Sequence, residues 1–334
     1  MNILVTGGAG FIGSWTTEEL LKQGHNVICV DNFNDYYDPK QKESNMKGFL
    51  NNPKYTLFRV DIRDYDALKG IFIENQIDKI IHLAAMAGVR NSITNPKLYH
   101  DVNVNGTINI LDLAKEFDIK HVVCASSSSV YGNTKNIPFT ESDTEISPIS
   151  PYAETKRLGE VLCKKYHEQY AMNIVCLRFF TVYGPRGRPD MAPHKFTRNL
   201  LEDKPIEVYG DGTSKRDYTY VTDIATGIVA ALIVEGFHII NLGNNKPIEL
   251  KYFISLIENN VNKKFNIIRK PMQEGDMLAT HANINEARTV LGYNPKVSIE
   301  EGIKRLVEWH KTENLVKNIQ IDMEKEGQIV YCQF

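Results

Sequence analysis

Apolar segments alternate with amphipathic ones along the first half of the chain. The first is NILVT, followed by a glycine-rich stretch, a helical pattern from Ser14 to Gln23 and a second apolar run, NVICV. Strand, glycine turn, helix and strand make the first βαβ unit of a parallel sheet. The pattern continues in four further apolar runs, which are Tyr55–Val60, Lys79–Leu83, His121–Ala125 and Ile174–Phe180.

Helical patterns lie between these runs. Two long ones cover about Asn95–Phe117 and Tyr152–Tyr170, where apolar residues recur at the helical period. Connections between parallel strands are right-handed. The alternation therefore predicts an α/β fold, in which a Rossmann-like, doubly wound parallel sheet carries helices on both faces.

The pattern changes after Phe180. The segment TVYGPRGRPDMA is rich in proline, glycine and arginine, and regular periodicity returns only with a helical stretch at Pro193–Leu201. A helix and a strand that rejoin the sheet are predicted over Val221–Leu242. We therefore expect two interleaved domains. The first covers residues 1–180 plus about 219–245, and the second, a smaller C-terminal substrate-binding domain, covers 181–218 and 246–334. The weakly periodic segment after about residue 314 has no predicted role.

The charges are nearly balanced, because 39 Lys and Arg stand against 41 Asp and Glu. Without a basic surface, neither nucleic acid nor an anionic lipid surface is an expected partner. No apolar run approaches the roughly 18 residues that a membrane span needs. The five cysteines are scattered and lie mostly in apolar segments, which predicts buried thiols and a cytoplasmic protein.

The glycines after the first strand form the most informative motif. Gly7, Gly10 and Gly13 fit the spacing of dinucleotide-binding turns, directly after a strand and at the start of a helix. Glycines there allow a tight turn and the close approach of a pyrophosphate, which the positive end of the helix attracts. Phe11 and Ile12, inside the motif, are expected beside the same cofactor.

Asp31 follows the second strand, where a carboxylate can accept hydrogen bonds from the adenosine ribose. It would repel a 2′-phosphate, and no Arg or Lys comes directly after it. The expected cofactor is therefore NAD and not NADP. By their position at the carboxyl edge of the sheet, further expected cofactor contacts are Asn32, Asp61, Ile62, Leu83, Ala84 and Ala85.

Tyr152 and Lys156 are candidates for proton transfer. Four residues apart on a predicted helix, they project from one face. A tyrosine is a poor base at neutral pH, but a nearby ammonium and a cationic nicotinamide both favour its phenolate. Ser127, at the carboxyl end of the fifth strand, would orient or relay the same proton. The nine histidines form no metal-binding spacing, and no metal site is expected.

Several segments resemble the extended short-chain dehydrogenase/reductases and, within them, the nucleotide-sugar epimerases. They are TGGAGFIG, DNFNDYYD, HLAA, AGVRNS, SSSSVYG, SPYAETK and RFFTVYGPRGRPDMA. Ser127, Tyr152 and Lys156 match the family's catalytic triad. The resemblance implies that a UDP-sugar is oxidised at carbon 4 by tightly held NAD and reduced again on its other face. It also implies a homodimer built from the two long helices.

Two positions separate competing chemistries within that family. Its sugar dehydratases carry Asp and Glu after the catalytic hydroxyl residue, whereas this chain has Ser128 and Ser129. A serine hydroxyl is too weak an acid or base for dehydration, which is therefore disfavoured. The related UDP-glucuronate decarboxylases usually carry Glu where Ser129 stands. That reading is less favoured but stays open.

TVYGPRGRPDMA and DNFNDYYD most resemble UDP-glucuronate 4-epimerases. The resemblance implies that Arg188 faces the sugar carboxylate, which a guanidinium fork matches, although Arg186 could take this role instead. It assigns further substrate contacts to Ser128, Thr181, Arg90, Tyr209, Arg216 and Asp276. The alternatives are a 4-epimerase of neutral UDP-sugars and, from another class, a non-catalytic NAD-binding regulator.

Overall fold

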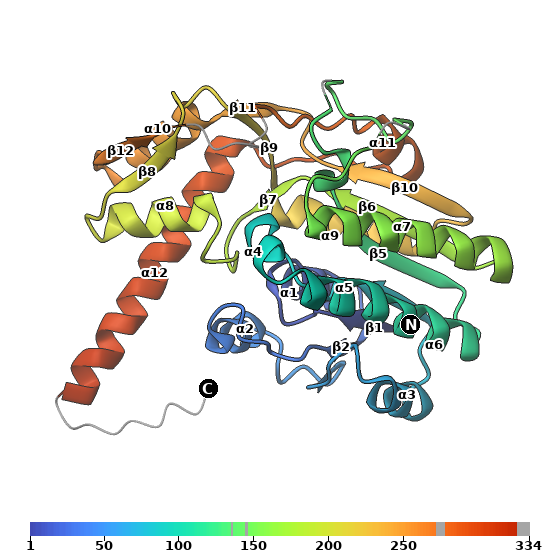
Figure 1. Cartoon of the computed structure of the whole chain (residues 1–334). Helices are drawn as coiled ribbons and strands as arrows, with labels where there is room; N and C mark the ends of the chain where they lie inside the picture. Colours follow the sequence, from blue (N-terminus) through green and yellow to red (C-terminus); the bar gives the residue numbers. More distant parts are fainter. Residues whose placement is uncertain (135, 144–145, 272–277, 326–334) are drawn as a thin grey trace.

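A parallel sheet forms the centre of the computed structural model, which describes residues 1–134, 136–143, 146–271 and 278–325. Within these ranges the sheet has seven strands in the order β10-β6-β5-β4-β1-β2-β3, and every neighbouring pair is parallel. The expected Rossmann-like fold is thereby confirmed (Figure 1). Its strands are β1 Asn2–Thr6, β2 Asn26–Val30, β3 Tyr55–Phe58, β4 Lys79–His82, β5 His121–Ser127, β6 Asn173–Phe179 and β10 Phe237–Leu242.

Helices cover both faces of the sheet because alternate strand residues point to opposite sides. On β1, Ile3 and Val5 pack into the hydrophobic core under one helix layer, whereas Leu4 packs into the core under the other. The first layer includes α1 Phe11–Lys22, α9 Val221–Ala230 and α11 Asn285–Leu291. The second includes α3 Tyr65–Glu74, α6 Gly106–Glu116 and α7 Pro151–Tyr170.

The long helix expected over Asn95–Phe117 is interrupted. The structure has α4 Val89–Thr94, α5 Pro96–His100, a π-helical turn η1 Asp101–Asn105 and then α6. Inside this turn, the Asn103 side chain accepts from the Met86 backbone N–H at 2.7 Å and donates to the Met86 carbonyl at 3.0 Å. Such turns often mark functional sites. Here it fixes the strand-end segment after β4 to the helix.

The strands also differ from the expectation in places. The third strand stops at Phe58, short of Val60, because its pairing with β2 ends where Val30 meets Phe58. The short strand β7 Thr181–Tyr183 lies in the segment expected to be irregular. With three residues it is too short to show a period.

The rest of the chain packs around a third hydrophobic core. Here lie two small sheets, with strand orders β11-β9-β7 and β12-β8. Besides β7, the strands of these sheets are β8 Ile206–Tyr209, β9 Lys215–Tyr220, β11 Pro247–Glu249 and β12 Ile267–Lys270. The helices of this region are α8 Ala192–Leu201, α10 Leu250–Val261 and α12 Ile299–Lys325. The helix α9 and strand β10 return to the main sheet, as the sequence predicts. The division into two domains stays a prediction.

Three short elements complete the fold: α2 Pro39–Met46 and the single-turn helices η2 Ser128–Tyr131 and η3 Ala231–Ile233. The helix α12 continues past residue 314, where the sequence predicted nothing, and stands away from the body in Figure 1. None of the helices in the described ranges has the length and apolar character that crossing a membrane requires.

Candidate active site

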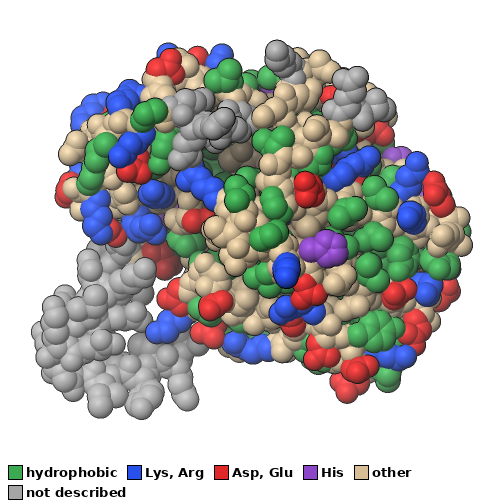
Figure 2. All heavy atoms as spheres, in the orientation of Figure 1, with side chains coloured by type: hydrophobic (Ala, Val, Ile, Leu, Met, Phe, Trp, Pro, Cys, Tyr) green, Lys and Arg blue, Asp and Glu red, His purple; other side chains and the backbone are tan. Residues whose placement is uncertain are grey.

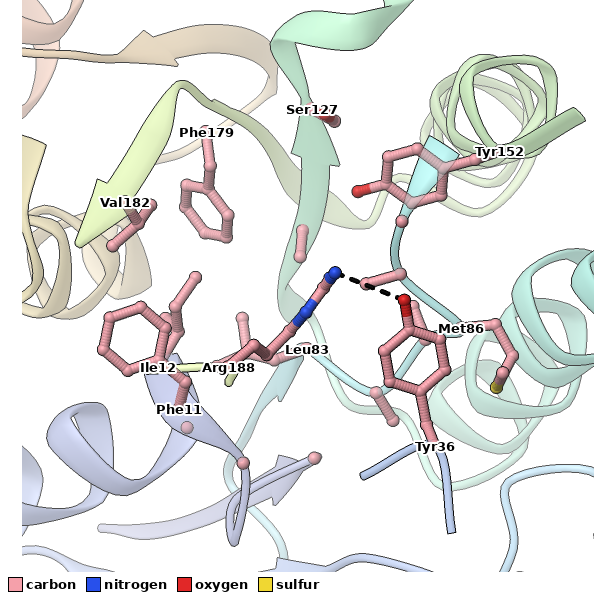
Figure 3. Close-up of a pocket in the computed structure, with 18 of the residues that line it drawn as sticks. Phe11, Ile12, Tyr36, Leu83, Met86, Ser127, Tyr152, Phe179, Val182 and Arg188 are labelled. Atoms are coloured by element: carbon pink, nitrogen blue, oxygen red, sulfur yellow. Dashed lines mark hydrogen bonds between the residues drawn. The ribbon is translucent and has the colours of Figure 1, made fainter. Parts of the chain in front are cut away.

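A cavity of about 480 Å³ opens along the carboxyl ends of the parallel strands and extends toward the segment after β7. Parallel α/β sheets bind their ligands at this edge. Figure 3 shows that side chains from both parts of the chain point into it. The predicted site residues in its wall are Gly7, Gly10, Phe11, Ile12, Gly13, Asp31, Asn32, Ile62, Leu83, Ala84, Ala85, Ser127, Ser128, Tyr152, Lys156, Thr181 and Arg188.

The glycine turn is shaped for a ligand that approaches the backbone. Gly7 adopts φ +71°, and a Cβ at Gly13 would collide with the Gly7 carbonyl oxygen. Gly10 is the N-cap of α1 and makes no side-chain cap, and the first turn holds no acidic residue. The partial positive charge of this helix end thus faces the cavity, where a pyrophosphate would fit.

Asp31 lies directly after β2, and both of its recorded hydrogen bonds reach Oδ1. They come from Lys42 Nζ at 2.8 Å and from the Phe33 backbone N–H at 2.9 Å. Within the described chain Oδ2 has no recorded partner, so it can accept from a ribose hydroxyl. Lys42, on α2, also lines the cavity. The sequence shows no sign of this contact, because Lys42 lies eleven positions after Asp31 and no helical or strand period relates the two.

Ser127 ends β5 with its oxygen already accepting hydrogen bonds. Ser129 donates to Ser127 Oγ twice, from its hydroxyl at 2.9 Å and from its backbone N–H at 3.2 Å. With both lone pairs engaged, the Ser127 proton is available to another acceptor. Burial raises the pKa of Tyr152, whereas the Ser127 hydroxyl lowers it.

The Lys156 ammonium donates to the Ala125 carbonyl at 2.9 Å. Burial lowers the pKa of Lys156 to about 8. The Ser127 hydroxyl and the Arg188 charge lower the pKa of Tyr152. That Lys156 favours the Tyr152 phenolate stays a prediction.

The two candidate arginines separate clearly. Arg188 lines the cavity, and its side chain lies near Tyr36 in Figure 3. Arg186 instead pairs with Glu18 at 2.6 Å, and its guanidinium lies 4.6 Å from the centre of the Trp15 ring. Both partners belong to α1. Of these two arginines, Arg188 is therefore the one whose guanidinium can reach a ligand in this cavity.

The segment 184–187, which precedes Arg188, is attached to the cofactor side of the molecule. Trp15 Nε1 donates to the Pro185 carbonyl at 3.0 Å. From α2, Gln41 Nε2 donates to the carbonyl of Gly187 at 2.8 Å. Together with the Arg186–Glu18 pair, these bonds join this segment to α1 and α2.

Four predicted site residues lie outside the cavity wall. Asp61 accepts from Asn32 at 2.7 Å and pairs with Arg63, which places it beside the expected adenosine end. The Arg90 guanidinium lies 5.8 Å from the centre of the Tyr209 ring. Arg216 donates to the neighbouring Lys215 carbonyl. One further predicted site residue, Asp276, falls outside the described residues.

Three residues near the cavity were not predicted from the sequence: Tyr36, Lys42 and Asn103. Tyr36 belongs to the segment DNFNDYYD, which resembles the epimerases but gave no role for this tyrosine. Its hydroxyl lies 3.3 Å from Arg188 Nη2. Asn103 also donates to Thr155 Oγ1 at 3.0 Å and so connects η1 to α7. No local pattern marks these residues, because their partners are distant in the sequence.

Comparison with known proteins defines the group. The sequence model of the NAD dependent epimerase/dehydratase family matches residues 3–243. The chain belongs to this family. It is 44% identical over 320 residues to the UDP-glucuronate 4-epimerase of Thermodesulfobacterium geofontis, which covers 95% of this chain and 99% of that protein.

Two solved structures of family members are also similar. The UDP-glucuronic acid 4-epimerase of Bacillus cereus, in complex with UDP-glucuronic acid and NAD, matches with a TM-score of 0.88 and 37% identity over 94% of this chain and 100% of that one. The UDP-glucose 4-epimerase of Thermotoga maritima, with UDP-glucose, matches with a TM-score of 0.87 and 29% identity over 94% and 100% of the two chains. NAD therefore fits both the family and the glycine turn of this chain.

Proposed function

We propose that the protein is an NAD-dependent UDP-glucuronate 4-epimerase, which interconverts UDP-glucuronate and UDP-galacturonate. One observation carries the proposal. The Arg188 guanidinium lines the same cavity as the Tyr152 hydroxyl and the glycine turn. An acid–base group, a carboxylate-binding group and a dinucleotide site thus face one space. The similarity to UDP-glucuronate 4-epimerases supports the same substrate.

The residues divide the chemistry among them. Gly7, Gly10, Gly13 and Asp31 would hold NAD, which would supply an acceptor for the hydride of carbon 4 of the sugar and the donor for its return. Tyr152 removes the proton from the hydroxyl on that carbon and afterwards gives it back. Ser127 directs its own proton at the Tyr152 oxygen and so stabilises the phenolate. Lys156 holds its ammonium at the end of β5 and would bind the nicotinamide ribose.

Arg188 protects the oxidised sugar. A 4-keto uronate is a β-keto acid, which loses carbon dioxide when its carboxylate bond aligns with the carbonyl π system. The planar guanidinium fork binds a carboxylate in a defined orientation, and Ser128 and Thr181 offer hydroxyl groups to the same anion. Residues with weaker UDP assignments are Arg90, Tyr209, Arg216 and Asp276, and they remain proposed nucleotide contacts.

The test is a side-by-side assay of the purified protein with UDP-glucuronate and UDP-glucose. We expect UDP-glucuronate to yield UDP-galacturonate without added cofactor and without net loss of carbon dioxide. Turnover of UDP-glucose with none of UDP-glucuronate would contradict the substrate assignment. UDP-xylose as the main product would indicate a decarboxylase, and no turnover of any UDP-sugar would favour a regulator.

Tyr152→Phe tests the acid–base role. Removing a general acid–base group costs about 10²- to 10⁴-fold in turnover, so we expect a loss of that size with unchanged NAD content. The control is Tyr252→Phe on α10, whose hydroxyl contacts only the exposed Glu300 among the described residues. A Tyr152→Phe enzyme with nearly normal turnover would refute the assignment.

We also propose that the protein forms a homodimer and acts in the cytosol. In support of the dimer, large apolar side chains are exposed on α4, α5 and α7, and Ile93, Leu98, Leu158 and Val161 are among them. These helices lie on one face of the molecule in Figure 1, and Figure 2 shows apolar side chains spread over that face. The four described cysteines are buried free thiols, which suits a reducing compartment.

A further inference from the structure

Three groups surround the Arg188 guanidinium. Asp190 accepts from Arg188 Nε at 3.0 Å and from Nη2 at 2.6 Å, which is a bidentate pair along one edge of the fork. The Tyr36 hydroxyl lies 3.3 Å from Nη2, and the Tyr36 ring lies 5.1 Å beneath the guanidinium carbon. Figure 3 shows the Tyr36 hydroxyl turned toward this arginine.

The close packing depends on a glycine on the opposite wall. Gly88 has φ +104°, and a Cβ there would press into the Tyr36 hydroxyl and approach Arg188 Nη2 to 3.2 Å. A side chain at position 88 would therefore displace the Tyr36 hydroxyl. The guanidinium is therefore held from two sides, by Tyr36 and by Asp190.

This arrangement leaves one nitrogen of the fork available. A guanidinium has five N–H donors. Asp190 accepts from Nε and Nη2, the Tyr36 hydroxyl also accepts from Nη2, and among the described residues no hydrogen bond involves Nη1. The two N–H groups of Nη1 can therefore donate to a second carboxylate. Asp190 and a substrate carboxylate would then bind different nitrogens of the same guanidinium.

The charge of Asp190 argues against a role in affinity. A second negative charge on the same guanidinium weakens its attraction for an anionic sugar. Asp190 is also half-exposed, with 47% of its side chain accessible, whereas only 18% of the Arg188 side chain is accessible. A half-exposed carboxylate that orients a partly buried guanidinium restricts how the fork can turn, which matters for a reaction that depends on carboxylate orientation.

We infer that Asp190, assisted by Tyr36, is a positioning residue: it turns the free Nη1 group of Arg188 toward the sugar carboxylate and so suppresses decarboxylation of the 4-keto sugar. The inference rests on the proposed function and deepens it. In the suppressed reaction, the C5–C6 bond breaks, its electron pair moves to the C4 carbonyl as an enolate, carbon dioxide leaves, and C5 takes a proton from water.

The experiment measures product partition in Asp190→Asn. Asparagine presents an NH₂ group to one of the two Arg188 donors, so the bidentate pair is lost. We expect the ratio of carbon dioxide released to UDP-galacturonate formed to rise about tenfold, the size expected when a charge-assisted hydrogen bond is removed. The dissociation constant for UDP-glucuronate should not increase, because the variant removes a repulsive charge.

Two further variants and a control sharpen the result. Tyr36→Phe removes a longer, uncharged contact and should raise the ratio less than Asp190→Asn does. Asp190→Glu retains the carboxylate and should restore most of the wild-type partition. Asp203→Asn removes an exposed carboxylate that pairs with Lys263 at 2.8 Å, and it should behave as wild type. Substrate labelled at carbon 6 gives the carbon dioxide, and anion-exchange chromatography gives the sugars.

The outcomes distinguish the inference from the function on which it rests. If the wild-type enzyme epimerises UDP-glucuronate and Asp190→Asn shows an unchanged partition ratio, the inference is wrong and the function stands. Weaker binding and slower turnover at an unchanged ratio would mean that Asp190 only supports the local structure, which also overturns the inference. A wild-type protein that does not act on UDP-glucuronate would overturn both.

Discussion

At the residue scale, the hydrogen bonds of a buried histidine at a strand end determine its protonation state. His82, the last residue of β4, lies between two hydroxyl groups, with Nδ1 2.7 Å from Thr6 Oγ1 and Nε2 3.0 Å from Thr107 Oγ1. Burial and the charge of Lys156 lower the pKa of His82 to about 3. This histidine is a satisfied core residue, and it stays neutral in the folded protein.

The low pKa of His82 predicts acid sensitivity. Between its unfolded pKa of about 6.5 and its folded value, the unfolded chain binds a proton that the folded chain does not, so acidification favours unfolding. At pH 5 this single group should lower the free energy of unfolding by about 2 kcal/mol relative to neutral pH. Urea unfolding of the wild type and of His82→Asn at both pH values measures it. An equal pH dependence in the two proteins would contradict the prediction.

The residue scale also shows how far the sequence could predict the site. Asp31 and Ser127 were predictable because a strand end determines where such a side chain points. Lys42 and Tyr36 were not, since they come from a segment with no period and reach the cavity through tertiary packing. The environment of Tyr152 escaped prediction for the same reason, because Arg188 comes from a loop 36 positions further along the chain.

At the scale of elements, α7 is the support of the proton-transfer residues. Glu160, one turn after Lys156, receives the Arg178 fork from β6 at 2.8 and 2.9 Å and the Ser126 hydroxyl from β5 at 2.7 Å. Both partners of the ion pair are only 1% exposed. The helix is thereby fixed to the two strands beside the site.

Glu160→Gln should destabilise the protein strongly. It leaves the buried Arg178 charge without its counterion, and breaking such a pair costs about 3 to 5 kcal/mol. Denaturant unfolding measures the effect. Arg157→Ala is the matched control, since Arg157 binds the same carboxylate from a partly exposed position, where a loss of about 1 kcal/mol or less is expected. Equal losses in the two variants would contradict this account.

Element boundaries were less predictable than element types. The region expected to be one helix over Asn95–Phe117 is helical, but Pro96 starts a new segment and a π-helical turn follows over Asp101–Asn105. The amide of Asn103 has its partner at Met86, which no helical pattern reveals. The fold class could be predicted because it depends on strand and helix periods that recur along the chain. The interruption of the helix could not, because it depends on a single tertiary contact.

At the scale of the whole molecule, the exposed apolar face of α4–α7 predicts dimerisation. Leu158 and Val161 lie three residues apart on α7 and are 42% and 37% exposed. The double variant Leu158→Glu/Val161→Glu should shift the protein to the mass of one chain in light scattering. Ile73→Glu on α3, at a 68% exposed residue, is the control and should leave the mass unchanged. A wild-type protein that is a monomer at micromolar concentration would refute the proposal.

The bonds from Trp15, Glu18 and Gln41 to residues 184–187 have a practical consequence for protein engineering. Exchanging the 184–187 segment alone for another sequence would leave the tryptophan, the glutamate and the glutamine without their partners. An engineer who wishes to change the accepted sugar must transplant the contacting faces of α1 and α2 as well.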